Sequence, residues 1–122
     1  MTNWQEGHIT KRTEWSTTHL SLHIDGPHPD FTAGQFTRVA LDIDGERIAR
    51  PYSCVNAPTT PGVEIFFNTV PEGPLSNALA ALQVGDKIWL SGRCNGFLTL
   101  DEIPHSTTDL WMVATGTGIG PF

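Results

Sequence analysis

The segment Arg50-Pro51-Tyr52-Ser53 brings a cation, a flat aromatic ring and a hydroxyl together within four residues, and Tyr52 is the only tyrosine in the chain. Because side chains alternate along a strand, we expect Arg50 and Tyr52 on one face and Ser53 on the other. An anionic, aromatic ligand such as a flavin nucleotide needs such a set: a guanidinium for its phosphates, a ring against its ring and a hydroxyl at its edge. The same residues also fit an ordinary strand, so other parts of the chain are needed to distinguish a flavin-binding segment from a plain strand.

A short helical segment is a second candidate for binding phosphate. After Pro71-Glu72-Gly73-Pro74, the leucines at 75, 79 and 82 recur at helical spacing, which predicts a helix over residues 75–82. Its first turn has free backbone N–H groups and the Ser76 hydroxyl, and both suit a phosphate. The alternative is a helix that only plugs one end of the core.

The end of the chain has the pattern of a nucleotide-binding α/β unit. Residues 110–114 form a continuous apolar run, which is typical of a buried parallel strand, and a glycine-rich turn over 116–122 follows at once. One strand and half a turn do not make a complete unit. We therefore expect the sequence to stop at the entrance to a second domain.

Cysteine and histidine usage predicts no metal site. Cys54 and Cys94 are the only cysteines and lack metal-like spacing, so we expect two reduced thiols in a cytoplasmic protein. His19 and His23 are four residues apart, but the alternation around them is that of a strand rather than of a helix.

Length and charge exclude several classes of function. The chain of 122 residues is long enough for one domain with its own core, and its net charge of −6 argues against a nucleic-acid surface. No apolar run approaches the roughly 20 residues of a membrane helix, and the start has no signal-peptide pattern. We expect neither nucleic acid nor membrane as a partner.

Short alternating segments separated by turn residues cover the first hundred residues. They predict an all-β fold, a closed or nearly closed six-stranded antiparallel barrel with the helix as a cap, and a further strand at 111–114 outside it. The predicted barrel strands are residues 8–14, 18–24, 36–43, 46–55, 63–70 and 86–91.

Several motifs in this order resemble the ferredoxin–NADP reductase family, most closely its bacterial ferredoxin/flavodoxin–NADP reductases. The resemblance covers essentially the whole chain. Its main motifs are Phe31-Thr32-Ala33-Gly34-Gln35-Phe36, Arg50-Pro51-Tyr52-Ser53, Pro71-Glu72-Gly73-Pro74-Leu75-Ser76 and Gly116-Thr117-Gly118-Ile119-Gly120-Pro121.

The resemblance implies a Greek-key FAD-binding barrel over residues 1–101, and a linker with the first strand of a truncated NADP-binding domain over 102–122. It implies that Arg50 binds the FAD pyrophosphate, that Tyr52 stacks on the flavin ring, and that Ser53 lies near flavin N5 with a catalytic role. Pro51 belongs to the same motif. The implied remaining contacts are Pro74, Leu75 and Ser76 at the phosphates and Phe66 and Asn68 beside the cofactor. Thr117 is implied to approach the flavin from the first loop of the second domain.

The implied enzyme moves electrons between NADPH and ferredoxin or flavodoxin through FAD, and the present chain alone is expected to be inactive. Two alternatives remain at this point. One is the flavin reductase component of an oxygenase system. The other is a β-barrel that binds a partner without catalysis. The sequence does not identify the electron acceptor or the oligomeric state, and it does not separate NADP from NAD.

Overall fold

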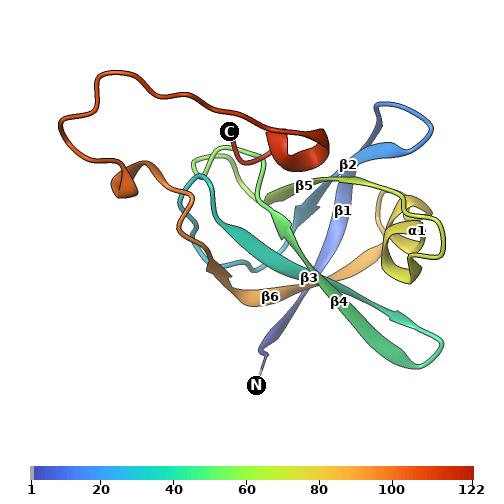
Figure 1. Ribbon diagram of the computed structural model, residues 1–122. Helices are drawn as coiled ribbons and strands as arrows, with labels where there is room; N and C mark the ends of the chain where they lie inside the picture. Colours follow the sequence, from blue (N-terminus) through green and yellow to red (C-terminus); the bar gives the residue numbers. More distant parts are fainter. Residues whose placement is uncertain (1) are drawn as a thin grey trace.

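The computed structural model describes residues 2–122, and its main element is one curled sheet of six strands (Figure 1). The order of strands across the sheet is β4-β3-β6-β1-β2-β5, and every neighbouring pair is antiparallel. Strands β3 and β6, and β2 and β5, pair although they are not consecutive in the chain, as in a Greek key. The all-β antiparallel prediction is confirmed. The strands are β1 (Trp4–Glu14), β2 (His19–Asp25), β3 (Phe36–Ile43), β4 (Glu46–Ser53), β5 (Val63–Asn68) and β6 (Lys87–Asn95).

The hairpin between β3 and β4 has the turn that its sequence requires. Asp44 and Gly45 both have positive φ, at 51° and 79°, which matches the right-handed twist of the two strands. Strands β1 and β6 are longer than predicted, because the first residues of β1 pair with β6 and the last residues of β6 pair with β3. These extensions depend on backbone hydrogen bonds and leave no alternating apolar pattern in the sequence.

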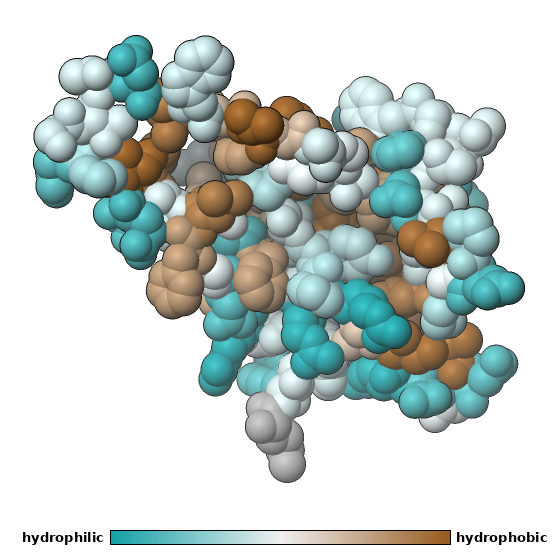
Figure 2. Space-filling model, viewed as in Figure 1, coloured by the Kyte–Doolittle hydropathy of each residue, from teal (hydrophilic) through white to brown (hydrophobic). Residues whose placement is uncertain are grey.

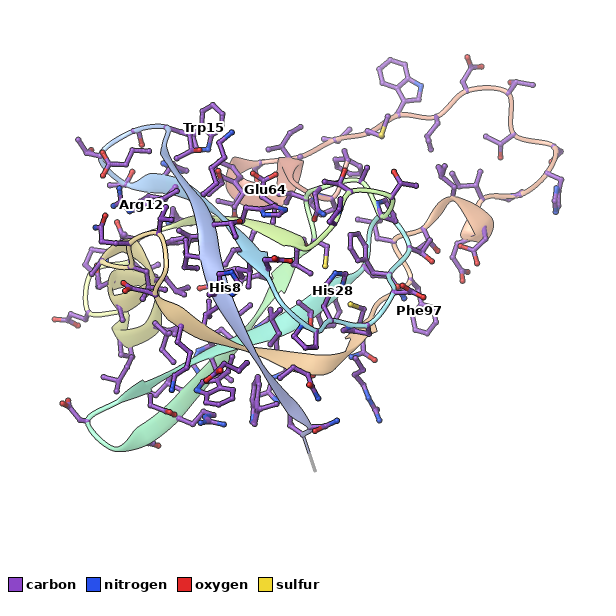
Figure 3. All side chains as sticks on the ribbon, turned by 180° about the vertical axis from the view of Figure 1, so that it is seen from behind. His8, Arg12, Trp15, His28, Glu64 and Phe97 are labelled. Carbon is purple, nitrogen blue, oxygen red and sulfur yellow. The ribbon has the colours of Figure 1, made fainter. Side chains whose placement is uncertain are left out.

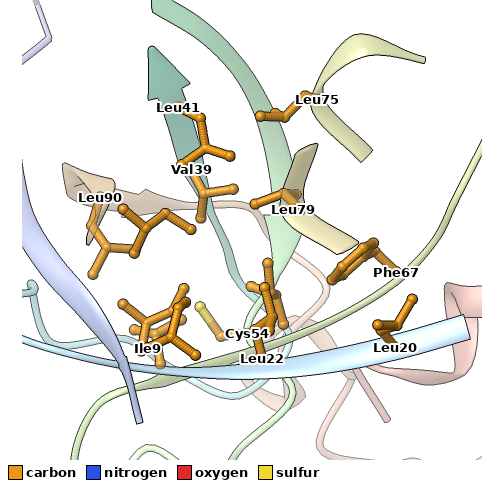
Figure 4. Close-up of a cluster of buried hydrophobic side chains, with 14 of the residues drawn as sticks. Ile9, Leu20, Leu22, Val39, Leu41, Cys54, Phe67, Leu75, Leu79 and Leu90 are labelled. Atoms are coloured by element: carbon orange, nitrogen blue, oxygen red, sulfur yellow. The ribbon is translucent and has the colours of Figure 1, made fainter. Parts of the chain in front are cut away.

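The core lies inside the curl of the sheet, and the helix α1 (Pro74–Ala80) closes one end of it. Leu75 and Leu79 point from α1 into the core and are almost fully buried, whereas Leu82 lies beyond the helix and is only partly buried. Figure 4 shows α1 and the strands contributing to the same cluster. The helix therefore caps the sheet as predicted, although it is shorter. Fully buried members of the cluster include Ile9, Leu22, Val39, Ile65, Ile88 and Leu90.

The sheet has two edges, β4 and β5, which approach each other; we call this place the seam. Just beyond β4 the N–H of Val55 donates to the carbonyl of Glu64 at 2.9 Å. Inside the curl, the rings of Tyr52 and Phe67 meet edge to face, with centroids 6.0 Å apart. The seam is thus closed at one end by a backbone hydrogen bond and inside by side chains.

The predicted strand at 111–114 is absent. After the short 3-10 turn η1 (Leu100–Glu102), the chain runs as an irregular arm and returns to β5 at the 3-10 turn η2 (Gly116–Ile119) (Figure 1). A buried parallel strand needs neighbouring strands and covered faces, and residues 2–122 provide neither at this place. Trp111 is accordingly 88% exposed, and Figure 2 shows hydrophobic atoms at the surface around the arm.

No helix within residues 2–122 has the length and apolar character that crossing a bilayer requires.

Arg12 fastens α1 to the sheet. Its Nη2 donates to the carbonyl of Ala80 at 2.7 Å, at the end of the helix, and Nη1 pairs with Glu14 at 2.8 Å. Figure 3 shows Arg12 on the side of β1 that faces the helix. A cation at the last carbonyls of a helix satisfies an acceptor and interacts favourably with the helix dipole.

We expect Arg12→Met to lower the free energy of unfolding by about 1–2 kcal/mol, because the carbonyl of Ala80 loses a charged donor. Arg12 Nε is buried without a hydrogen-bond partner, so removing it stabilises the fold. This stabilisation keeps the net loss of unfolding free energy moderate. Urea denaturation measures it. Lys11→Met is the matched control, since Lys11 is exposed on the same strand, and we expect a change within about 0.5 kcal/mol. Equal stabilities for the two variants would mean that Arg12 does not hold the helix.

Candidate functional site

The register of β3 and β4 orients the residues of the Arg50-Pro51-Tyr52-Ser53 segment. Arg50 lies opposite Val39 and Tyr52 opposite Thr37, and both of these β3 residues are buried. Since directly opposed residues in an antiparallel pair point to the same face, Arg50 and Tyr52 belong to the inner face of the sheet. Ser53 lies opposite Phe36 and belongs to the outer face. The alternation is as predicted.

Tyr52 is held by the core. Its half-buried ring packs edge-on against Phe67. Burial raises the pKa of the Tyr52 hydroxyl, and the nearby charge of Arg50 only partly opposes this. Tyr52 is therefore a neutral, fixed ring at neutral pH. Phe67 was not singled out from the sequence, although the alternation in β5 marks it as an inward residue.

Arg50 and the start of α1 meet at one cavity of about 450 Å³, which is lined by Arg50, Pro74, Arg38 and Arg47 among others. The Arg47 guanidinium is already engaged, since Nε and Nη2 donate to the Asp42 carboxylate at 2.8 and 3.0 Å. Arg50 is exposed and donates from Nη1 to the carbonyl of Ala49 at 2.7 Å. A guanidinium has five N–H donors, so most of its capacity remains for a ligand. The cavity suits an anion.

At the start of α1, backbone groups are more accessible to a ligand than side chains are. Pro74 occupies the first turn and has no N–H, and the Leu75 side chain is buried in the core. The Ser76 hydroxyl is also buried, and its oxygen accepts a hydrogen bond from the N–H of Val70 at 3.0 Å. This bond has no signal in the sequence. A phosphate contact by Ser76 stays a prediction and has to use the hydrogen of the hydroxyl.

Phe66, Asn68 and Thr117 lie elsewhere on the seam. Phe66 and Asn68 are on the less buried face of β5, opposite to Phe67, so the structure does not bring Phe66 beside Tyr52. Phe66 instead lines an apolar groove of about 440 Å³ together with Trp15, Val55, Glu64 and Gly120. Figure 3 shows Trp15 and Glu64 near η2.

The glycine-rich turn packs close to the end of β4. A Cβ on Gly120 would lie 2.5 Å from Cγ1 of Val55, which is two residues after Ser53. Thr117 is half-buried within η2, and its carbonyl accepts the N–H of Gly120 at 3.1 Å. The structure therefore brings the turn to the seam, while a contact between Thr117 and a ligand stays a prediction.

No group of three or more histidine, cysteine or acidic side chains in residues 2–122 is arranged to hold a metal ion.

Comparison with known proteins assigns the family. The family model of the oxidoreductase FAD-binding domain matches residues 7–98, which is most of the chain. The chain belongs to the oxidoreductase FAD-binding domain family. The curled antiparallel sheet described above is therefore the sheet of an oxidoreductase FAD-binding domain.

Relatives of this FAD-binding domain are longer proteins. The flavodoxin/ferredoxin–NADP reductase of Escherichia coli is 49% identical over 122 residues, which are 100% of this chain and 49% of the relative. The ferredoxin–NADP reductase of Pseudomonas aeruginosa is 31% identical over 123 residues and is covered to 47%. The chain spans about half the length of the curated relatives it matches.

A solved structure agrees with the fold. The ferredoxin NADP+ reductase from Neisseria gonorrhoeae, with bound FAD and NADP, superposes with a TM-score of 0.91 at 33% identity. The superposition covers 97% of this chain and 48% of that one. A flavohemoglobin from Malassezia yamatoensis, at 18% identity and a TM-score of 0.74, shares the fold alone.

Proposed function

We propose that this chain is the FAD-holding part of a ferredoxin/flavodoxin–NADP reductase. The observation that carries the proposal is the arrangement along β4, where Arg50 shares an anion-suited cavity with the start of α1, and Tyr52 and Ser53 follow at the seam. Its family and its 49% identity to a flavodoxin/ferredoxin–NADP reductase support the same assignment.

The residues present fit FAD. Arg50 has donors left for a pyrophosphate, and the backbone N–H groups of Leu75 and Ser76 lie at the start of α1 next to the same cavity. Tyr52 has a ring already fixed by Phe67, so stacking on it costs little conformational entropy. Pro51 keeps Arg50 extended, because the residue before a proline is disfavoured from the helical region.

When bound, FAD supplies two kinds of chemistry: exchange of a hydride with one partner and exchange of single electrons with the other. The chain's own residues bind and orient it. Tyr52 covers apolar ring surface and acts mainly on affinity. Ser53, on the outer face, provides a hydroxyl that donates or accepts a hydrogen bond as charge changes at the ring.

The partners in this proposal are NADP(H) and ferredoxin or flavodoxin, after the names of the relatives. Residues 1–101 would form the FAD domain, and 102–122 would lead into an NADP-binding domain. The relatives, which are about twice as long, support this division. A cytoplasmic location belongs to the same proposal and is supported by two free cysteines.

The decisive experiment compares Ser53→Val with Tyr52→Phe in the longer protein that contains this chain, saturated with FAD. We expect Ser53→Val to slow reduction by NADPH at least about tenfold, a barrier increase near 1.4 kcal/mol, because an interaction that strengthens in the transition state is lost. Tyr52→Phe keeps the ring and should stay within a few-fold. Stopped-flow bleaching of the flavin absorbance measures both rates.

Residues 1–122 alone, with FAD added, should show no NADPH-dependent bleaching. If they bleach with NADPH, the division into two domains is wrong. If Ser53→Val reacts as fast as the unaltered protein, Ser53 has no part in the reaction.

A further inference from the structure

Two cysteine thiols lie close to the Arg50-Pro51-Tyr52-Ser53 segment and have no role in the proposed reaction. Cys54 follows Ser53 directly, and Cys94 lies near the end of β6. Cys94 pairs with Thr37 of β3. On the other side of β3, the N–H of Cys54 donates to the carbonyl of Gln35, the residue immediately before this strand, at 3.0 Å. The two cysteines therefore lie on either side of the start of β3.

Both side chains share the inner face of the sheet. Cys94 is opposite Thr37, which is buried. Cys54 comes one residue after Ser53, whose side chain belongs to the outer face, and it is 2% exposed within the core. The curl of the sheet brings both side chains to the same apolar core, in which Cys54 is buried and against which Cys94 packs. They are free in this structure.

We propose that Cys54 and Cys94 form an oxidation site, in which a peroxide converts the two thiols into an intramolecular disulfide. Cys94 reacts first because it is only half-buried, and Cys54 resolves the product.

Oxidation proceeds in two steps, through a sulfenic acid on Cys94 to the disulfide. The Cys94 thiolate attacks one oxygen of hydrogen peroxide, so that an S–O bond forms, the O–O bond breaks and hydroxide leaves, giving a sulfenic acid. The Cys54 sulfur then attacks the Cys94 sulfur; an S–S bond forms, the S–O bond breaks, and the departing hydroxide takes up the Cys54 proton. Two thiols lose two electrons and two protons, and the peroxide becomes two waters.

The electrostatics support this order of attack. The hydrogen bond from Cys54 lowers the pKa of the Cys94 thiol to about 7, and the same hydrogen bond together with burial raises the pKa of Cys54. The thiolate is the nucleophile in peroxide chemistry. At neutral pH a substantial fraction of Cys94 is thiolate, while Cys54 stays protonated until the sulfenic acid forms.

Closing the bond has a structural consequence. Strands that flank a common neighbour lie about 9–10 Å apart in a flat sheet, whereas a disulfide joins Cα atoms about 4.4–6.8 Å apart. Cys54 lies beyond the last residue of β4, outside the strand ladder. We expect Cys54 to move when the bond closes and to displace the adjacent Ser53.

The first test is mass spectrometry on the purified protein, which is reduced, desalted, treated with hydrogen peroxide and blocked with N-ethylmaleimide. We expect loss of two hydrogens and a link between tryptic peptide 48–87 and the peptide that begins at Cys94, since trypsin cleaves after Arg93 and does not cleave between Arg50 and Pro51. Maleimide on both cysteines after treatment, or a sulfinic Cys94 without the link, would overturn the proposal.

Single variants separate the two roles. In Cys54→Ser, Cys94 should stop at the sulfenic acid and be trapped by dimedone. In Cys94→Ser, Cys54 should stay reduced. Cys54→Ala removes the hydrogen-bond donor, so the pH midpoint for alkylation of Cys94 by iodoacetamide should rise from near 7, and the rate at pH 7 should fall roughly tenfold. An unchanged pH profile in Cys54→Ala contradicts the pairing of the thiols.

Discussion

Replacing Gly34 with alanine is expected to destabilise the protein by roughly 3–5 kcal/mol, because backbone strain and a steric overlap act together. Gly34 has a φ of +102°, which disfavours any side chain, and an added Cβ would lie 1.7 Å from the carbonyl oxygen of Leu98. The backbone after β6 has to move away. A loss of this size is a large part of the stability of an ordinary domain.

The neighbouring Gln35 makes this displacement matter for the site. Its carbonyl accepts the N–H of Cys54 at 3.0 Å, and its side chain donates to the carbonyl of Gly96 at 3.3 Å. The turn therefore ties together the start of β3, the end of β4 and the end of β6. Gly34→Ala should disturb the residue that follows Ser53 as well as lowering the melting temperature.

Gly45→Ala is the matched control. Gly45 also has a positive φ, +79°, but a Cβ added there would meet nothing within 4 Å. We expect a loss of only about 1 kcal/mol from backbone strain. Chemical denaturation measures the loss of unfolding free energy in both variants. The difference between the two losses is the contribution of the steric overlap with Leu98. If the two losses agree within error, the close approach of Gly34 to Leu98 does not contribute.

Arg50→Ala is expected to weaken FAD binding by roughly 10- to 150-fold, or about 1.5–3 kcal/mol, through loss of a charge-assisted hydrogen bond to the pyrophosphate. The Arg50 side chain is exposed and packs against little, so its removal leaves the core intact. Titration of the apo-form of the longer protein with FAD, followed by flavin fluorescence, gives the dissociation constants.

Two further variants sharpen the result. Arg50→Lys keeps the charge but loses the planar fork, and an intermediate affinity is expected. Arg93→Ala removes an exposed arginine that does not line the Arg50 cavity, and it should change affinity only within a few-fold. If Arg50→Ala keeps FAD through dialysis as tightly as the unaltered protein, Arg50 has a structural role and the assignment of the pyrophosphate site is wrong.

Much of the fold could be predicted because its signals are local. The bounds of β3 follow from its alternating residues and the Asp44-Gly45 turn, and α1 follows from the spacing of its leucines. The ends of β1 and β6 could not be predicted, since they are set by pairing with distant strands. The prediction of a strand at 111–114 was wrong. Apolar residues indicate that a segment suits a buried strand, but they do not indicate whether a neighbouring strand is present to pair with it.

The candidate site was predictable only in part, for the same reason. The faces of Arg50, Tyr52 and Ser53 follow from alternation within one strand. The contact of Tyr52 with Phe67 depends on how the two edges of the sheet meet, and the bond from Val70 to Ser76 depends on the path of a loop. Neither has a spacing that can be read from the sequence.

Besides placing Arg50 and Tyr52, β4 has to avoid pairing with another chain, and Pro51 serves this second requirement. An edge strand exposes backbone donors and acceptors to which another chain could add, and proline is one of the few residues that interrupts such a row without breaking the sheet. Because β4 pairs only with β3, it can accommodate a residue that lacks an N–H. The proline that keeps Arg50 extended thus also protects the protein against edge-to-edge aggregation.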